Sequence, residues 1–113
     1  MSTSLRRRPV RALLLIIALL AAFGTATALA ASPTVRLKDD FFTTKTLSVS
    51  RGTSVTWTWA GSLNHTVTVK SGPAKFSSKL QVHGTYSHRF TARGTYTLFC
   101  KIHPFMKMTV LVH

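Results

Sequence analysis

Short runs in which polar and apolar residues alternate dominate the chain from residue 34 onward. The clearest run covers residues 53–60, where Val55, Trp57 and Trp59 fall on one face and hydroxylated side chains on the other. A period of two residues is typical of a half-buried β-strand, and the β-branched and aromatic content favours the same structure. We therefore expect a strand here, with both tryptophans packed in a core.

Similar runs recur along the chain, separated by turn signals at intervals of roughly 8–12 residues, which is typical of a β-sandwich. No segment after the N-terminal region shows the 3.6-residue period of a helix. The sequence therefore predicts an all-β, antiparallel β-sandwich of about seven to eight strands. The expected strands cover residues 34–38, 45–50, 53–60, 66–70, 85–92, 95–100 and 107–112.

The N-terminal segment has the pattern of a secretory signal peptide. Four arginines up to residue 11 precede an aliphatic stretch at 13–22, and Ala28-Leu29-Ala30 follows as a small-x-small cleavage signal. The strongly apolar stretch is shorter than the roughly 20 residues that span a bilayer. We expect residues 1–30 to be a signal peptide and residues 31–113 one domain, exported to the periplasm or the cell exterior. The alternative is an uncleaved anchor.

The predicted mature chain is strongly basic. From residue 31 onward, seven lysines and four arginines stand against Asp39 and Asp40, a formal charge of +9. Such a surface attracts anionic partners, and export argues against nucleic acid. We expect a monomer that docks transiently with acidic redox proteins, with association to an anionic membrane surface as a further option. The alternative is that the charge only keeps an exported domain soluble.

Metal-binding residue types cluster between the last two expected strands. Cys100 is the only cysteine, so an internal disulfide is excluded, and His103 and Met106 follow at three-residue intervals. A thiolate, an imidazole and a thioether together favour copper over zinc, calcium or magnesium. A copper site for electron transfer needs a second imidazole, and His65, at a loop-to-strand junction, is the natural fourth ligand. This geometry requires His65 and Cys100 at the same end of the sandwich.

The residues that carry these ligands resemble a known family. Asn-His-Thr-Val at 64–67 and the run from 84 to 106, which ends in Cys-Lys-Ile-His-Pro-Phe-Met, are similar to the plastocyanin/amicyanin group of cupredoxins. The resemblance covers nearly all of residues 35–112. It implies a Greek-key β-sandwich, one type 1 copper ion and one-electron transfer. It also implies equatorial ligation by His65, Cys100 and His103 and axial ligation by Met106.

Three positions leave alternatives or depart from the family. Met108 stands at the longer, plastocyanin-like spacing, but its use as a ligand would leave the closing strand too short, so we prefer Met106 and expect Met108 in the core. Thr66 replaces an asparagine that often ties the ligand loops together, a task its hydroxyl could perform. Trp59 stands where a polar residue is common. The last two departures bear on the reduction potential, which hydrogen bonds around the ligands tune.

The function that follows is that of a mobile electron carrier and not an enzyme. Copper delivery or sequestration in the cell envelope is the alternative, because it uses the same soft ligands. A metal-free basic module for acidic polymers would leave the Cys-x-x-His-x-x-Met spacing unexplained. The remaining histidines are expected to be simply solvated: His83, His88 and His113.

We expect electrons to pass through the edge of His103, within an apolar patch that contains Pro104 and Phe105. Exposed apolar patches often mark docking surfaces. Lys101 and Lys107 flank this segment and would orient an acidic partner.

Overall fold

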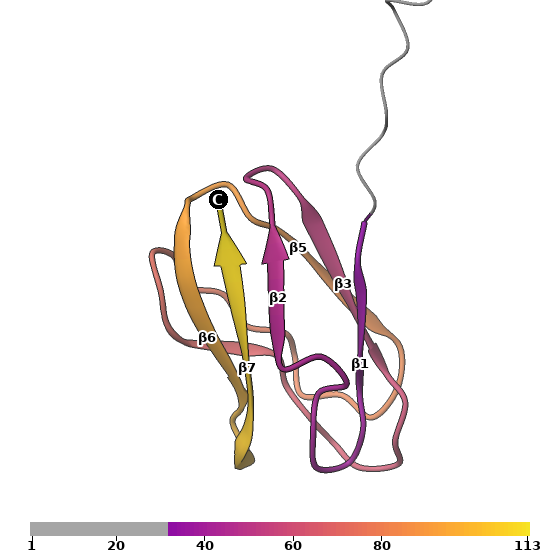
Figure 1. Cartoon of the computed structure of the whole chain (residues 1–113). Helices are drawn as coiled ribbons and strands as arrows, with labels where there is room; N and C mark the ends of the chain where they lie inside the picture. The colour runs from indigo at the N-terminus through magenta and orange to yellow at the C-terminus, as the bar shows by residue number, and fades with distance from the viewer. Residues whose placement is uncertain (1–31) are drawn as a thin grey trace, which may run out of the picture.

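The computed structural model describes residues 32–113, so the predicted signal peptide at 1–30 lies outside the described part (Figure 1). Within residues 32–113, no helix is long and apolar enough to cross a membrane. The described part contains seven strands: β1 (Thr34–Leu37), β2 (Thr46–Val49), β3 (Ser54–Trp59), β4 (Thr68–Ser71), β5 (Thr85–Arg89), β6 (Gly94–Cys100) and β7 (His103–Val112).

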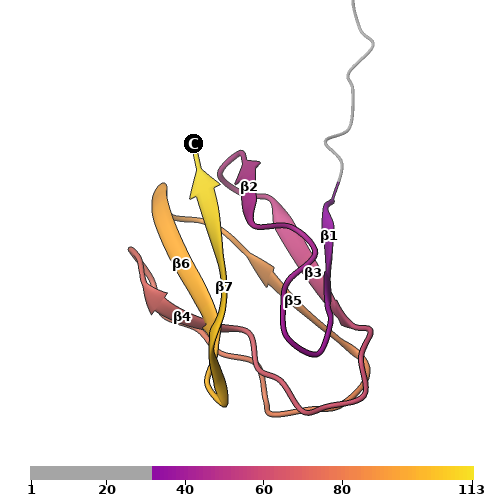
Figure 2. The same ribbon diagram turned by 60° about the horizontal axis from the view of Figure 1, so that its bottom comes forward.

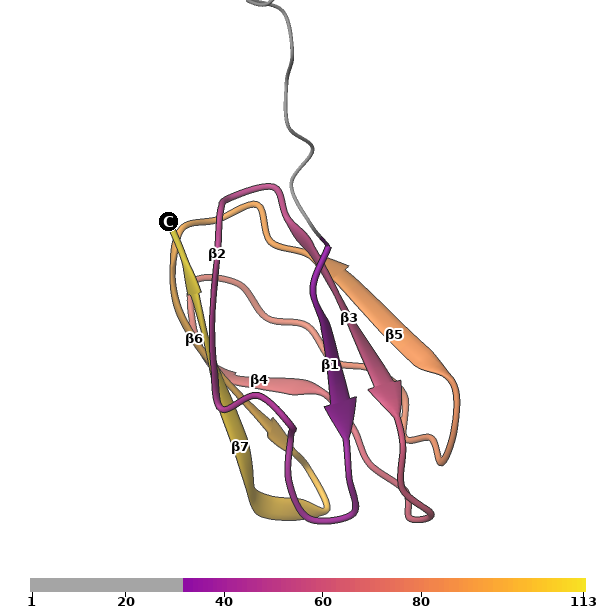
Figure 3. The ribbon, with the colours of Figure 1, turned by 45° about the vertical axis from the view of Figure 1, so that its right-hand side comes forward.

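The strands form two facing sheets, as Figures 2 and 3 show, with the orders β1-β3-β5 and β2-β7-β6-β4. The predicted all-β sandwich and its strand number are confirmed. The pairing is mixed, however, and not wholly antiparallel, because β1 pairs with β3 and β2 with β7 in parallel. The chain leaves the first sheet for β2 and then returns, and these two reversals give β3 the direction of β1 (Figure 3).

The ends of the sandwich differ in what they carry. The turn between β6 and β7 lies at one end, which we call the hairpin end (Figure 1). The C-terminus and the beginning of β1 lie at the opposite end in all three ribbon views. There the Arg51 N–H donates to the carbonyl of His113 over 2.8 Å.

Both tryptophans of β3 lie in the core, as predicted. Trp57 is fully buried and packs against Phe76, Tyr86 and Phe90, with ring centroids 6.4, 6.0 and 6.3 Å away. Its indole N–H donates to the sulfur of Met108 over 3.4 Å, which satisfies the one polar atom of the ring. Trp57 on β3 and Met108 on β7 therefore link the two sheets within the core.

The last strand begins earlier than the sequence predicts, at His103 and not at residue 107. The register explains this: Phe99 pairs with Lys107 but Cys100 pairs with His103, with an irregularity between Phe99 and Cys100. A bulge of this kind adds residues to one strand without ending the ladder. The segment expected as a ligand loop is therefore strand for most of its length.

The expectation of simple solvation holds for His83 and His113, which are exposed, but it is wrong for His88. His88 is partly buried and stacks on Phe76 with ring centroids 3.7 Å apart. Burial lowers the pKa of its imidazole, because desolvation disfavours the charged form. His88 lies on the same face of β5 as Tyr86, and Phe76 from the preceding connection stacks on both rings.

Candidate metal centre

His65, Cys100 and His103 meet at the hairpin end, with one donor atom of each within 4.8 Å of the others. The Cys100 Sγ lies 3.7 Å from Nδ1 of His65 and 3.8 Å from Nδ1 of His103, and the two Nδ1 atoms are 3.1 Å apart. His65 and Cys100 are fully buried, whereas His103 is partly exposed. The predicted convergence of a distant histidine on Cys100 is confirmed.

Each of the three residues is held by backbone pairing. Cys100 ends β6 and His103 begins β7, and the two residues face each other across the hairpin. His65 exchanges two backbone hydrogen bonds with Gln81, of 3.0 and 3.2 Å. Its carbonyl also accepts the indole N–H of Trp59 over 3.2 Å. Trp59, which departs from the family pattern, thus helps to hold the backbone of His65.

Thr66 ties the segments that carry His65 and Cys100 together, as its position predicts. Its backbone N–H donates to Cys100 Sγ over 3.4 Å. Its hydroxyl oxygen accepts the backbone N–H of Lys101 over 3.0 Å. Thr66 is thereby hydrogen-bonded both to the side chain of Cys100 and to the backbone of Lys101.

The Thr66 hydroxyl begins a chain of hydrogen bonds. It lies 2.8 Å from the Thr68 hydroxyl, which lies 2.8 Å from that of Ser77. The Ser77 hydroxyl donates its single hydrogen to the carbonyl of Ser78. Thr68 must therefore donate to Ser77, and Thr66 to Thr68, so that all bonds run in one direction from the Lys101 N–H. Such a chain is mutually polarised, which strengthens its members.

The two methionines of β7 have different surroundings. Both are buried on the inward face of the strand, with Met106 nearer the hairpin turn. Met108 lies opposite Leu98 and its sulfur accepts the indole N–H of Trp57, so it has the core role expected of it. The axial role of Met106 stays a prediction.

One residue of the site was not singled out from the sequence. Asp39, in the connection between β1 and β2, places its Oδ1 atom 3.4 Å from Nε2 of His65. The same oxygen accepts the backbone N–H groups of Ser62 and Leu63 over 2.8 and 2.9 Å. The Leu63 N–H is the largest cause of a lowered Asp39 pKa. The one feature of the sequence that could have drawn attention to Asp39 is that it is one of only two acidic residues.

The donor set fits copper. Three lone-pair donors, two nitrogens and one sulfur, face one another at separations of 3.1 to 3.8 Å. Atoms that share one first-row metal ion, with bonds of roughly 2.0–2.3 Å to each, have separations of this size. Two imidazoles and one thiolate are the trigonal set of blue-copper sites.

Comparison with known proteins agrees with this chemistry. The sequence model of the copper-binding proteins of the plastocyanin/azurin family matches residues 34–113. The chain belongs to this family. Amicyanin-alpha of Methylorubrum extorquens is 38% identical to it over 111 residues, which cover 84% of this chain and 93% of that protein. The resemblance drawn from the sequence is confirmed.

Solved structures of the plastocyanin/azurin family and its relatives have the same fold. A reduced variant of amicyanin superposes with a TM-score of 0.66 at 29% identity, covering 75% of this chain and 86% of that one. A copper-containing nitrite reductase from Thermus scotoductus gives 0.67 at 30% identity, covering 79% of this chain. This chain spans only 24% of the reductase. As an amicyanin-like family member, the chain is a type 1 copper protein and an electron carrier.

Proposed function

We propose that His65, Cys100 and His103 are the equatorial ligands of the copper ion, that Met106 is its axial ligand, and that the protein shuttles electrons between exported redox partners without transforming a substrate. The convergence of two Nδ1 atoms and one thiol sulfur carries this proposal. Copper delivery, the alternative raised by the sequence, is not favoured, because His65 and Cys100 are fully buried and lack an open approach.

The copper ion supplies a one-electron couple, and the residues around it supply a frame that moves little. The Thr66 N–H donates to the Cys100 sulfur and so restrains and partly neutralises a thiolate there. The two bonds to Gln81 restrain the backbone that carries His65. Metal-binding atoms that are already in position need to move little when the charge of the site changes.

Electrons are proposed to pass through His103, the one partly exposed member of the three. Phe105 lies beside it, with ring centroids 6.0 Å apart, and is 68% exposed. Ile102 is also exposed, at 48%. This apolar surface suits a docking site, and the exposed Lys101 and Lys107 beside it suit an acidic partner.

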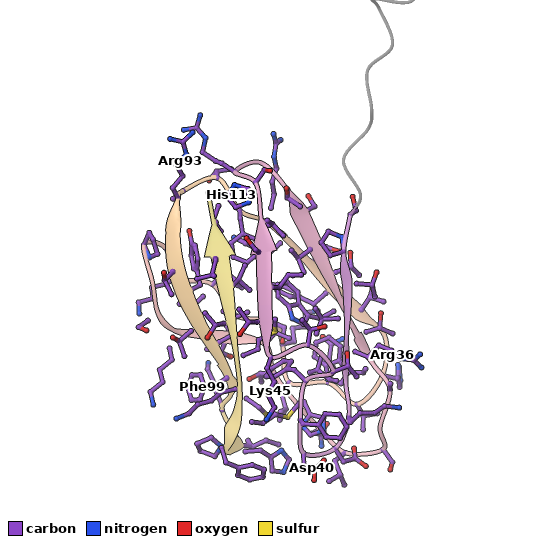
Figure 4. All side chains as sticks on the ribbon, in the orientation of Figure 1. Arg36, Asp40, Lys45, Arg93, Phe99 and His113 are labelled. Carbon is purple, nitrogen blue, oxygen red and sulfur yellow. The ribbon has the colours of Figure 1, made fainter. Side chains whose placement is uncertain are left out.

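The docking proposal predicts a rate that depends on salt. Electron exchange with an acidic redox protein should slow by about tenfold or more as ionic strength rises to physiological values, because screening weakens steering. Stopped-flow measurement of the second-order rate constant checks this. A double variant, Lys101→Gln with Lys107→Gln, should reduce the salt dependence. Arg93→Gln is the matched control, since Arg93 lies at the opposite end (Figure 4). A rate independent of ionic strength contradicts steering.

The proposed function also requires export of the protein. We infer that residues 1–30 direct the chain to the periplasm or the cell exterior and that residues 31–113 act there as a monomeric domain. The basic n-region, the aliphatic stretch and the Ala-Leu-Ala signal support this. Mass spectrometry of the protein from the cell envelope would locate its N-terminus.

The axial assignment predicts different results for the two methionines of β7. Met106→Leu should keep the blue colour and shift the reduction potential, because an axial ligand tunes the potential without supplying the charge transfer. Met108→Leu should change neither, but it should cost about 1–3 kcal/mol of stability, since leucine conserves the volume and leaves the buried indole N–H of Trp57 without its sulfur acceptor. Redox titration of the copper-loaded variants measures the shift. If only Met108→Leu moves the potential, Met108 is the axial ligand.

A further inference from the structure

Asp39 is unusual in this chain because a strongly basic protein places one of its two carboxylates at its metal centre. Its Oδ1 atom lies 3.4 Å from Nε2 of His65, and the His65 side chain is only 1% exposed. Asp40, the next residue, is exposed and carries the same charge. Figure 4 labels Asp40 at the hairpin end. The two neighbouring aspartates therefore lie at the same end of the molecule and differ mainly in that Asp39 contacts His65.

The contact selects one form of the His65 ring. A carboxylate only accepts hydrogen bonds, so Nε2 must carry the hydrogen. A neutral imidazole has a single N–H, and the Nδ1 atom of His65 is therefore left with a free lone pair. That atom faces the Cys100 sulfur at 3.7 Å and Nδ1 of His103 at 3.1 Å.

Hydrogen bonds from the neighbouring loop hold the Asp39 carboxylate in this place. The Ser62 N–H and hydroxyl and the Leu63 N–H all donate to it, so the loop just before His65 closes around its oxygens. A Cβ atom at Gly61 would collide with the same carboxylate. Position 61 therefore needs glycine as long as Asp39 points toward His65.

We propose that Asp39 is a positioning residue that holds His65 as the Nε2-protonated tautomer and lowers the reduction potential of the site. A hydrogen-bonded carboxylate orients a ligand imidazole and makes it a stronger donor. A fixed negative charge beside the ring favours the more highly charged Cu(II) state over Cu(I). The inference rests on the proposal that His65 is a copper ligand.

The test is Asp39→Asn, with Asp40→Asn as the matched control. The amide oxygen of asparagine still accepts from Ser62 and Leu63, but the charge at His65 is lost. We expect Cu(II) affinity, measured by chelator competition, to fall by about 10- to 100-fold, with a smaller loss for Cu(I). A tenfold loss of preference for Cu(II) raises the potential by about 59 mV for one electron. Asp40→Asn should give only a small fraction of this shift.

A second measurement needs no copper, and its main result comes from the wild-type protein. In ¹⁵N NMR of the copper-free wild-type protein, with the imidazoles neutral, His65 should be protonated at Nε2, and Asp39→Asn should weaken this preference. Protonation at Nδ1 in the wild type overturns the inference, even if Asp39→Asn fails to fold. Equal shifts of the potential in both variants, or none, also overturn it. If the wild-type protein develops no blue colour with Cu(II), the proposed function fails instead.

Discussion

Replacing Cys100 by alanine is expected to abolish the strong blue colour that the wild-type protein develops with Cu(II). The colour arises from charge transfer between a thiolate and the copper ion, and Cys100 is the only cysteine in the chain. No other residue can therefore supply the thiolate. Visible absorption spectra at equal copper content, determined by elemental analysis, measure the effect.

Serine at the same position is the matched control for Cys100→Ala. Alanine leaves the Thr66 N–H without its partner, at a cost of about 1–3 kcal/mol for a buried donor. The serine oxygen can accept that hydrogen bond, so Cys100→Ser should be the more stable variant and yet equally colourless. A blue Cys100→Ser protein would show that the colour has another origin.

Trp57→Ala should have the largest effect on stability. Truncation of a buried tryptophan costs about 3–5 kcal/mol, a large share of the roughly 5–15 kcal/mol that stabilises a typical domain. Trp57 contacts three other aromatic rings and the sulfur of Met108, so no single neighbour can fill the space it leaves. Urea unfolding of the copper-free protein, followed by circular dichroism, measures the loss.

Trp57→Phe separates the volume of the ring from its hydrogen bond. Phenylalanine keeps most of the apolar contact and gives up the N–H bond to Met108, so its cost should be clearly smaller. Copper should raise the stability of both variants, because a ligand that binds the native state alone stabilises it. A loss below about 1 kcal/mol for Trp57→Ala would contradict a core role, since core truncations cost more.

Local patterns were enough to predict much of this molecule. Alternation along β3 identified the buried face that carries Val55 and both tryptophans. The Cys100 to Met106 spacing identified the chemistry of the site, because the proposed ligands Cys100, His103 and Met106 lie on a single hairpin. His65 is 35 residues away from Cys100, yet its position before a strand and the need for a second imidazole were sufficient to find it.

The features that the sequence did not reveal depend on how distant connections meet. Asp39 is 26 residues from His65 in sequence, and only the packing of the β1–β2 connection against the loop after β3 brings them together. The parallel pairing of β2 with β7 likewise depends on which sheet each strand joins. The early start of β7 depends on a bulge at Cys100, which alternation alone does not predict.

Both ends of the described chain lie on the side of the sandwich away from the hairpin end (Figure 1). A tether attached to either terminus, whether an uncleaved anchor, a fusion partner or a linker to an electrode, would therefore leave His103 and Phe105 facing outward. Attachment through either terminus would therefore immobilise the domain for electrochemistry without covering the surface through which current is proposed to flow.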